Sequence, residues 1–471
     1  MTLNSKLSML LPLVTFLISL LFFTAVTQGL TGILTENRRS TLLTTLSENQ
    51  LDSGGFSAFT LGMSTSGDAY HTAQILMILN TLEALERIRV DDAVNHILTR
   101  QHVSAGNSKI WGWPVPAGSL NVSDLYIVDT VLTGLSLVNA LNSVNKTALV
   151  EFALSRYNHS SGAFFEPVYQ LSTSSGVREI SFCYFPLEFY ANSDLAYSES
   201  NLISTSLGVS VLATLDALSE INTTRTLQWI KMCRAENAMF APFPGAKPDY
   251  LPPWSSLATN PFYVDNHGTG LAYTYAALRA LNMFAGLDDT DAVKDAMQEY
   301  VLSCQENASK GAALHFRAHT DDQKHTTGIG SRHYTYYAIR ILYYIDRLEA
   351  IETVSEGVTD AVLMEQNLLY RDTWPLPDGP GYYGDVGKGN VYSLFLSDFL
   401  PVSATRFSIA ILNWTDSLGT LDEPTPVAVR AWINLSAISI LLSLATIPVM
   451  LVYKKLRCVE RIPGTRLKNN S

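Results

Sequence analysis

Gln50-Leu-Asp-Ser-Gly-Gly-Phe56 is followed after a short loop by Asp68-Ala-Tyr-His-Thr72, and these two segments are the strongest indication of the fold. The second segment opens 69–88, where apolar residues recur at helical spacing and cover almost the whole circumference of a helix. A helix that is apolar all round is buried on several sides. The next segment, 90–101, has apolar residues on one face and charged residues opposite. The sequence therefore predicts a buried inner helix paired with an outer helix that keeps one face in water.

The same pair of helices returns along the chain. Further pairs are predicted at 124–142 with 146–157, 200–219 with 223–234, 268–285 with 289–305, and 333–349 with 354–368. Two unpaired segments remain, an outer helix at 37–49 and an inner helix at 390–400. An open solenoid of hairpins needs polar terminal caps, whereas these two segments complement each other as one more hairpin. We therefore expect an all-α ring, an α/α toroid of about six helical hairpins, over residues 36–412.

The loops between the helices resemble a known repeat. The turns Gln50 to Phe56, Tyr157-Asn-His-Ser-Ser-Gly-Ala-Phe164 and Gln305-Glu-Asn-Ala-Ser-Lys-Gly311 precede inner-helix starts such as Asp68 to Thr72 and His333-Tyr-Thr-Tyr336. This pattern is similar to the prenyltransferase and squalene-oxidase repeat. The resemblance implies the α/α toroid of protein prenyltransferase β subunits, terpenoid cyclases and complement-like thioester domains. It is specific for the fold and much less so for the activity.

The protein prenyltransferases that this chain resembles bind zinc through an Asp-x-Cys and through a His in a later Tyr-His-Thr. The resemblance therefore implies a zinc site at the matching positions of this chain. This chain has Asp265-Asn-His267 in the first place, so a histidine replaces the cysteine. Aligning Thr335 puts Tyr334 in the histidine position and displaces His333 by one residue, about 100° around a helix. Asp265, His267 and His333 are candidate zinc ligands, and helix caps or hydrogen-bonded histidines are the alternative interpretation.

The other chemistries of the toroid are represented less well. Cyclases that protonate their substrate use Asp-x-Asp-Asp, and the nearest match, Gly286-Leu-Asp-Asp-Thr-Asp291, lacks the first aspartate. These acids also open a predicted outer helix, where they stabilise the helix N-terminus. The Gly-Cys-Gly-Glu-Gln thioester loop is absent from the sequence. The sequence leaves open whether the chain is an enzyme of the prenyltransferase or cyclase kind.

Aromatic residues gather where inner helices begin, which in a ring is at its mouth. Aromatic walls with polar tips suit an isoprenoid, another lipid or a sugar, although core filling explains the same residues. The residues expected to line a ligand cavity are Tyr70, His71, Tyr334, Tyr336, Tyr337 and Trp374.

Both ends of the chain carry features of a membrane protein. Residues 1–27 read as a secretory signal peptide, with an uncleaved signal anchor as the alternative. Residues 431–453 contain no charge and are long enough to cross a bilayer. The tail 454–471 holds six basic residues against one acid, which predicts a cytoplasmic C-terminus. Residues 413–430 read as a stalk, so the ring is expected outside the cell membrane, on a single-pass anchor.

Composition and charge limit the classes of partner and modification that we expect. The 471-residue chain has a net charge of −11, and its basic cluster is confined to the tail, so no nucleic-acid partner is expected. Four scattered cysteines do not form a disulfide framework. N-glycosylation triplets in the predicted outer region begin at Asn121, Asn145, Asn158, Asn222, Asn307 and Asn413.

Two hypotheses follow from the sequence. The first is a membrane-anchored, extracytoplasmic toroid that acts on or binds an isoprenoid or similar lipid. The second is a catalytically silent toroid that binds a glycan, lipid or protein at the cell surface.

Overall fold

The computed structural model describes residues 37–56, 67–102, 112–113, 115–117, 120–122, 124–165, 168–173, 176–181, 200–246, 270–287, 289–305, 316, 332–352, 355–359, 362–363 and 401–422. The predicted signal peptide, membrane span and cytoplasmic tail lie outside these ranges, as do residues 423–430 of the predicted stalk. No helix in the described part of the chain is long and apolar enough to cross a bilayer. The chain divides into two compact units, Leu42–Thr420 and Met1–Thr41 with Leu421–Ser471.

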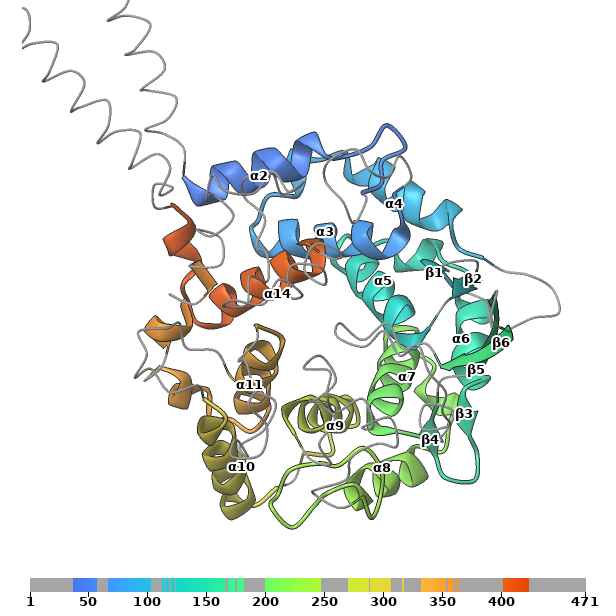
Figure 1. Cartoon of the computed structure of the whole chain (residues 1–471), viewed down its shortest axis with the longest axis vertical. Helices are drawn as coiled ribbons and strands as arrows, with labels where there is room; N and C mark the ends of the chain where they lie inside the picture. The colour runs from blue at the N-terminus through green and yellow to red at the C-terminus, as the bar shows by residue number, and fades with distance from the viewer. Residues whose placement is uncertain are drawn as a thin grey trace, which may run out of the picture. The chain divides into compact units, whose positions relative to one another are not determined.

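The larger unit contains a ring of inner helices (Figure 1). Each packs against the next in sequence, and the last, α14, packs against the first, α3, so the ring is closed. This confirms the predicted toroid. Burial follows from that position: every residue from Leu202 to Leu212 of α7 is buried. The inner helices are α3 (Ala69–Thr81), α5 (Leu125–Leu137), α7 (Leu202–Thr214), α9 (Leu271–Met283), α11 (Arg332–Tyr344) and α14 (Pro401–Trp414).

Outer helices alternate with the inner ones and are wet on one side. In α4 the buried residues are Ala93, His96 and Ile97, one face of the helix. The outer helices are α2 (Arg38–Glu48), α4 (Val90–Thr99), α6 (Lys146–Leu154), α8 (Thr223–Met232) and α10 (Asp291–Ser303), with further helical residues at 355–359 and 362–363. Short 3-10 turns follow five of the inner helices, all except α9 in the described part of the chain. They are η1 (Leu85–Arg87), η3 (Leu141–Ser143), η4 (Leu218–Glu220), η8 (Leu348–Ile351) and η9 (Leu418–Asp422).

Three antiparallel two-stranded hairpins occupy loops between helices. They pair β1 (Val115–Ala117) with β2 (Leu120–Val122), β3 (Tyr157–Asn158) with β4 (Ala163–Phe164), and β5 (Val168–Thr173) with β6 (Gly176–Ser181). The registers set Val115 opposite Val122, Tyr157 opposite Phe164 and Val168 opposite Ser181.

The inner helices end earlier than the sequence pattern predicts. The pattern extends the first one to 88, whereas α3 ends at Thr81. Glu83 then adopts a left-handed φ of 53°, and the amide of Ala84 donates to the Leu79 carbonyl at 2.8 Å. This is the Schellman C-cap, which usually contains glycine. The same left-handed position follows the other inner helices without glycine, at Asn139, Asp216, Ala285, Asp346 and Asp416.

The final inner helix also lies later than expected. The predicted segment 390–400 is outside the described residues, and the helix that closes the ring is α14, with Pro401 at its first position, where proline is favoured. The predicted domain end at 412 falls within this helix. The Thr359 hydroxyl donates to the Ser417 hydroxyl at 2.9 Å, so residues just after α14 still pack on the ring.

The described part of the smaller unit brings the ends of the folded region together. Arg39, near the start of α2, forms an ion pair with Asp422, the last residue of η9, at 2.8 Å between Nε and Oδ1. Leu421 beside it is fully buried. An exposed ion pair of this kind contributes about 0–1 kcal/mol, so it marks proximity more than it stabilises.

The turn motif works by docking a phenylalanine on the next inner helix. The backbone amide of Phe56 donates to Oγ1 of Thr72 at 3.0 Å, and Phe164, Phe240 and Phe316 do the same to Thr205, Thr274 and Thr335. All four rings are buried. In the second repeat Trp113 takes this place, and its indole donates to the Ile97 carbonyl at 2.8 Å. A backbone donor is thereby satisfied where the loop enters the core.

The Gln and Gly positions of the motif hold the outer layer. Oε1 of Gln50 accepts from the amide of Arg89, the residue before α4, at 2.9 Å. Gln101 makes the equivalent bond with Asn145, the residue before α6, at 3.0 Å. Gly54 has a φ of 84°, and a side chain on Gly55 would lie 2.1 Å from the His96 ring. Only glycine fits at these two positions.

The phenylalanine dock predicts a specific loss of stability. Thr205→Val keeps the shape of the side chain and leaves the buried Phe164 amide without its acceptor, which should lower the free energy of unfolding by about 2 kcal/mol. Thr133→Val is the control, because among the described residues that hydroxyl bonds only to the Asp129 carbonyl, one turn earlier in its own helix. Urea unfolding followed by circular dichroism measures both. Equal stability of the two variants would contradict the role given to the dock.

Candidate functional site

The structure accounts for part of the predicted site. Asp265, His267 and Trp374 lie outside the described residues, and His333 is described only as the second residue of α11. The described ranges contain no group of three or more His, Cys, Asp or Glu side chains able to hold a metal. They therefore do not supply a zinc donor set, and the zinc site remains a prediction of the sequence.

Several predicted cavity residues lie in one aromatic cluster. Tyr336 and Tyr337 lie on α11, and Tyr275 on the neighbouring helix α9 packs against them. The rings of Tyr275 and Tyr337 stack with 5.0 Å between their centroids and 17° between their planes. Tyr336 also contacts Phe407 of α14, edge to face at 5.2 Å. Tyr334 packs against Tyr337 at 6.2 Å, and both are buried. Tyr336 and Tyr275, by contrast, are only half-buried. Cavity lining and core filling both remain predictions for these tyrosines.

A polar network crosses the interior of the ring. One guanidinium nitrogen of Arg279 on α9 donates to both carboxylate oxygens of Asp129 on α5 at 2.8 Å, and to the Ser210 hydroxyl on α7 at 2.7 Å. Ser210 donates to Asp129 at 2.5 Å. Because α7 lies between α5 and α9, this network must lie on the inward side of the helices. Burial opposes the charge of Arg279, but Asp129 outweighs it and raises the arginine pKa above its usual value.

Two further arginines face the same interior without a carboxylate partner among the described residues. Arg340 of α11 donates to the Tyr344 hydroxyl at 2.7 Å and lies 4.7 Å from the Trp414 ring. Its Nε, and Nη1 of Arg406 on α14, are buried and lack a hydrogen-bond partner in the described part of the chain. Burial lowers the pKa of Arg406, but tyrosines led by Tyr126 and Tyr336 raise it more in total, so the group stays charged.

Two tyrosines near these cations, Tyr275 and Tyr337, remain neutral. Burial raises the pKa of Tyr337 well above its usual value, and it does the same for Tyr275. The described interior therefore combines fixed positive charge with aromatic walls at neutral pH. Cation–π contacts stabilise the arginines only partly. This environment favours an anionic group attached to an apolar body.

Tyr70 and His71 have separate roles at the start of α3. Tyr70 is fully buried, and its ring lies 5.8 Å from Tyr126, toward the interior arginines. His71 instead contacts the helix cap: Asp68 accepts from the His71 amide at 2.8 Å, and its other oxygen lies 2.6 Å from Nδ1. Burial raises the pKa of Asp68, but His71 more than offsets this, so the pKa lies below its usual value. The Asp-x-x-His pattern at this helix is a cap.

Two of the six glycosylation triplets begin at helix caps. Asn145 and Asn222 are exposed residues that precede α6 and α8, and each side-chain oxygen accepts an amide of the first turn at 3.1 and 3.0 Å. Asn158 caps the turn between β3 and β4, and Asn413 is exposed near the end of α14. Asn121 lies in β2, and Asn307 is outside the described residues. Glycosylation at all six remains a prediction.

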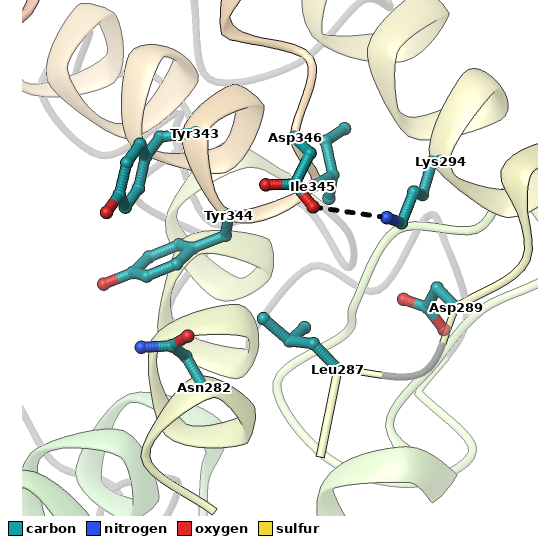
Figure 2. A pocket seen from close by; sticks show the side chains of 8 residues that line it. All are labelled: Asn282, Leu287, Asp289, Lys294, Tyr343, Tyr344, Ile345 and Asp346. Carbon is teal, nitrogen blue, oxygen red and sulfur yellow. Dashed lines mark ion pairs between the residues drawn. The ribbon is translucent and has the colours of Figure 1, made fainter. Parts of the chain in front are cut away.

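A pocket of about 290 Å³ lies between α9, α10 and α11 (Figure 2). It is separate from the predicted cavity residues, and sequence patterns gave no signal for it. Its lining residues are Asn282, Leu287, Asp289, Lys294, Tyr343, Tyr344, Ile345 and Asp346.

Sequence reasoning also missed the interior network. A usable signal was present, because Asp129, Arg279, Arg340 and Arg406 are isolated charges within helices that are otherwise apolar on the buried side. A charge in such a helix needs a partner from another element. The partner could not be identified from the sequence, since Asp129 and Arg279 belong to helices that are not neighbours in the ring.

Comparisons with known proteins define the family. The model of the prenyltransferase alpha-alpha toroid domain matches residues 8–163, 108–251 and 255–369. The chain belongs to this prenyltransferase alpha-alpha toroid family. No curated protein sequence matches it.

Solved structures with a similar fold share little sequence with the chain. A variant of the type II terpene cyclase MstE from Scytonema, in complex with geranylgeranyl dihydroxybenzoate, is 14% identical, with a TM-score of 0.45 over 81% of this chain and 98% of that chain. The Candida albicans protein geranylgeranyltransferase-I complexed with GGPP is 12% identical, with a TM-score of 0.46 over 77% of this chain and 91% of that chain.

Proposed function

We propose that the ring interior binds an isoprenoid-type lipid with an anionic head group. The observation that carries the proposal is the pair of arginines, Arg340 and Arg406, which have buried donor atoms without partners among the described residues. A buried guanidinium with unsatisfied donors is costly, and an anionic ligand would satisfy them with charge-assisted hydrogen bonds. Arg279 is already paired with Asp129, and this ion pair links α9 to α5 inside the ring.

The aromatic walls would contact the apolar body of this lipid. Tyr275, Tyr336 and Phe407 present ring faces and edges from three consecutive inner helices. Such surfaces bind an unsaturated hydrocarbon chain by burial and by ring contacts. Membership in the prenyltransferase toroid family favours an isoprenoid over other lipids. Because the zinc and Asp-x-Asp-Asp motifs of the family are not intact in the sequence, the proposal is binding, and catalysis is not part of it.

We also propose that the ring is held outside the cell by one membrane helix. The support is the uncharged segment 431–453 and the six basic residues that follow it. A lipid-binding ring on such an anchor would meet its ligand at the membrane surface.

Lipid binding is tested with geranylgeranyl diphosphate, geranylgeraniol and inorganic diphosphate as probes of the purified full chain. We expect the diphosphate lipid to bind more tightly than the alcohol or inorganic diphosphate, since it combines charge and chain. Arg406→Gln should weaken binding of the diphosphate lipid by about tenfold or more, the loss of a charge-assisted hydrogen bond. Isothermal titration calorimetry measures each affinity.

The control is Arg347→Gln, which removes a partly exposed arginine that pairs with Asp291 and Asp295 outside the ring interior. Its affinity for geranylgeranyl diphosphate should equal that of the unchanged protein. Equal weakening in the two variants, or equal affinity for the alcohol and the diphosphate, would rule out the proposed head-group site.

Topology is tested by adding protease to intact cells that express the chain with a C-terminal tag. The ring should be digested and the tag spared, because the positive tail holds the C-terminus in the cytoplasm. Loss of the tag with retention of the ring would reverse the proposed orientation.

A further inference from the structure

The pocket between α9, α10 and α11 has its own lining and its own chemistry. Asn282 lies near the end of α9, Lys294 on α10, and Tyr343 and Tyr344 at the end of α11, with Asp346 just after them (Figure 2). Its volume of about 290 Å³ is near the lower end of the range for small-molecule pockets. A ligand of this pocket is therefore about the size of a single sugar or nucleobase.

The charged groups of the pocket are already neutralised by the protein. Lys294 pairs with Asp346 at 3.6 Å, a contact drawn in Figure 2. Asp289 receives two hydrogen bonds from the Arg234 guanidinium, at 2.5 and 2.6 Å. A charged ligand would have to compete with these pairs. A neutral ligand with hydroxyl groups can instead use the remaining lone pairs and hydrogens, which leaves both pairs intact.

The remaining surface of the pocket is suited to an amphipathic ring. The amide of Asn282 is exposed and makes no side-chain hydrogen bond with the described residues, so it can both donate and accept. Leu287 and Ile345 supply aliphatic surface between the polar groups (Figure 2). Tyr343 is 44% exposed, and its ring is held edge to face by Trp414 at 4.5 Å. The pocket thus offers apolar contacts to one face of a ligand ring, and hydrogen-bonding groups to its edge.

We propose that this pocket binds a neutral pyranose sugar. A pyranose has hydroxyl groups around its rim, which match the amide and the carboxylates of the pocket. The C–H groups on its faces match the aliphatic and aromatic surface. A nucleobase is a flat aromatic ligand with few donors, so it would make fewer hydrogen bonds than a pyranose with the amide and the carboxylates. Neither Arg340 nor Arg406 lines the pocket, although the Tyr344 hydroxyl on its wall accepts a hydrogen bond from Arg340. The sugar proposal rests on the pocket lining alone and does not use the lipid proposal.

The test is saturation-transfer NMR on the full chain with D-glucose, D-galactose, D-mannose and N-acetyl-D-glucosamine. At least one sugar should receive saturation from the protein. Asn282→Ala should weaken its binding by about fivefold, the loss of one neutral hydrogen bond. Leu287→Trp should abolish it by filling the pocket, and circular dichroism verifies that each variant is folded. Methyl glycosides of the bound sugar separate a free-sugar site, which would reject them, from a site for glycan ends, which would accept them.

The matched control is Asn95→Ala, which removes an exposed asparagine on the outer helix α4 and should leave sugar binding unchanged. Arg406→Gln should also leave it unchanged, although it weakens lipid binding. The proposal is overturned if none of the four sugars receives saturation, or if binding persists unchanged in both pocket variants.

Discussion

The arrangement depends on one packing constraint: an inner helix that is apolar almost all round needs an inner neighbour on each side. In a row of hairpins the first and last inner helices would each lack one neighbour. Packing of α14 against α3 removes both ends, because it gives every inner helix two neighbours. Burial of apolar surface contributes about 25 cal/mol per Å², so an uncovered helix flank would be a large loss. The phenylalanine docks and glutamine bonds then fix how each loop meets the next repeat.

Closure of the ring also creates an interior in which polar groups must satisfy one another. Asp129, Ser210 and Arg279 do so across three helices, and the network is complete. Arg340 has one hydrogen bond, to Tyr344, and both Arg340 and Arg406 keep a buried nitrogen without a partner in the described part of the chain. Two such cations within an aromatic lining lower the stability of the protein, and binding of an anionic ligand would offset this cost. The sugar pocket differs in kind, because its charges are paired before any ligand arrives.

Much of the ring could be predicted from the sequence, since helical periodicity and the Gln-to-Phe turns are local patterns. Helix ends could not, because Glu83, Asn139 and Asp216 adopt left-handed caps where glycine is the usual signal. The last inner helix was predicted at 390–400, whereas α14 begins at Pro401. No Gln-to-Phe turn precedes Pro401 in the sequence to mark where this helix begins. His71 was expected in the cavity, but its bond to Asp68 makes it part of a cap. The Asp129–Arg279 pair depends on which helices face each other, which periodicity does not reveal.

Hydrogen exchange of the native protein, followed by mass spectrometry, tests ring closure most directly. In a closed ring no inner helix is terminal, so amides in α3 and α14 should open with the same free energy as those in α7. In an open row, stability falls toward the ends, because terminal repeats have one neighbour. Uniform protection across the six inner helices is the expected result. Protection that is greatest in α7 and declines stepwise to α3 and α14 would contradict closure.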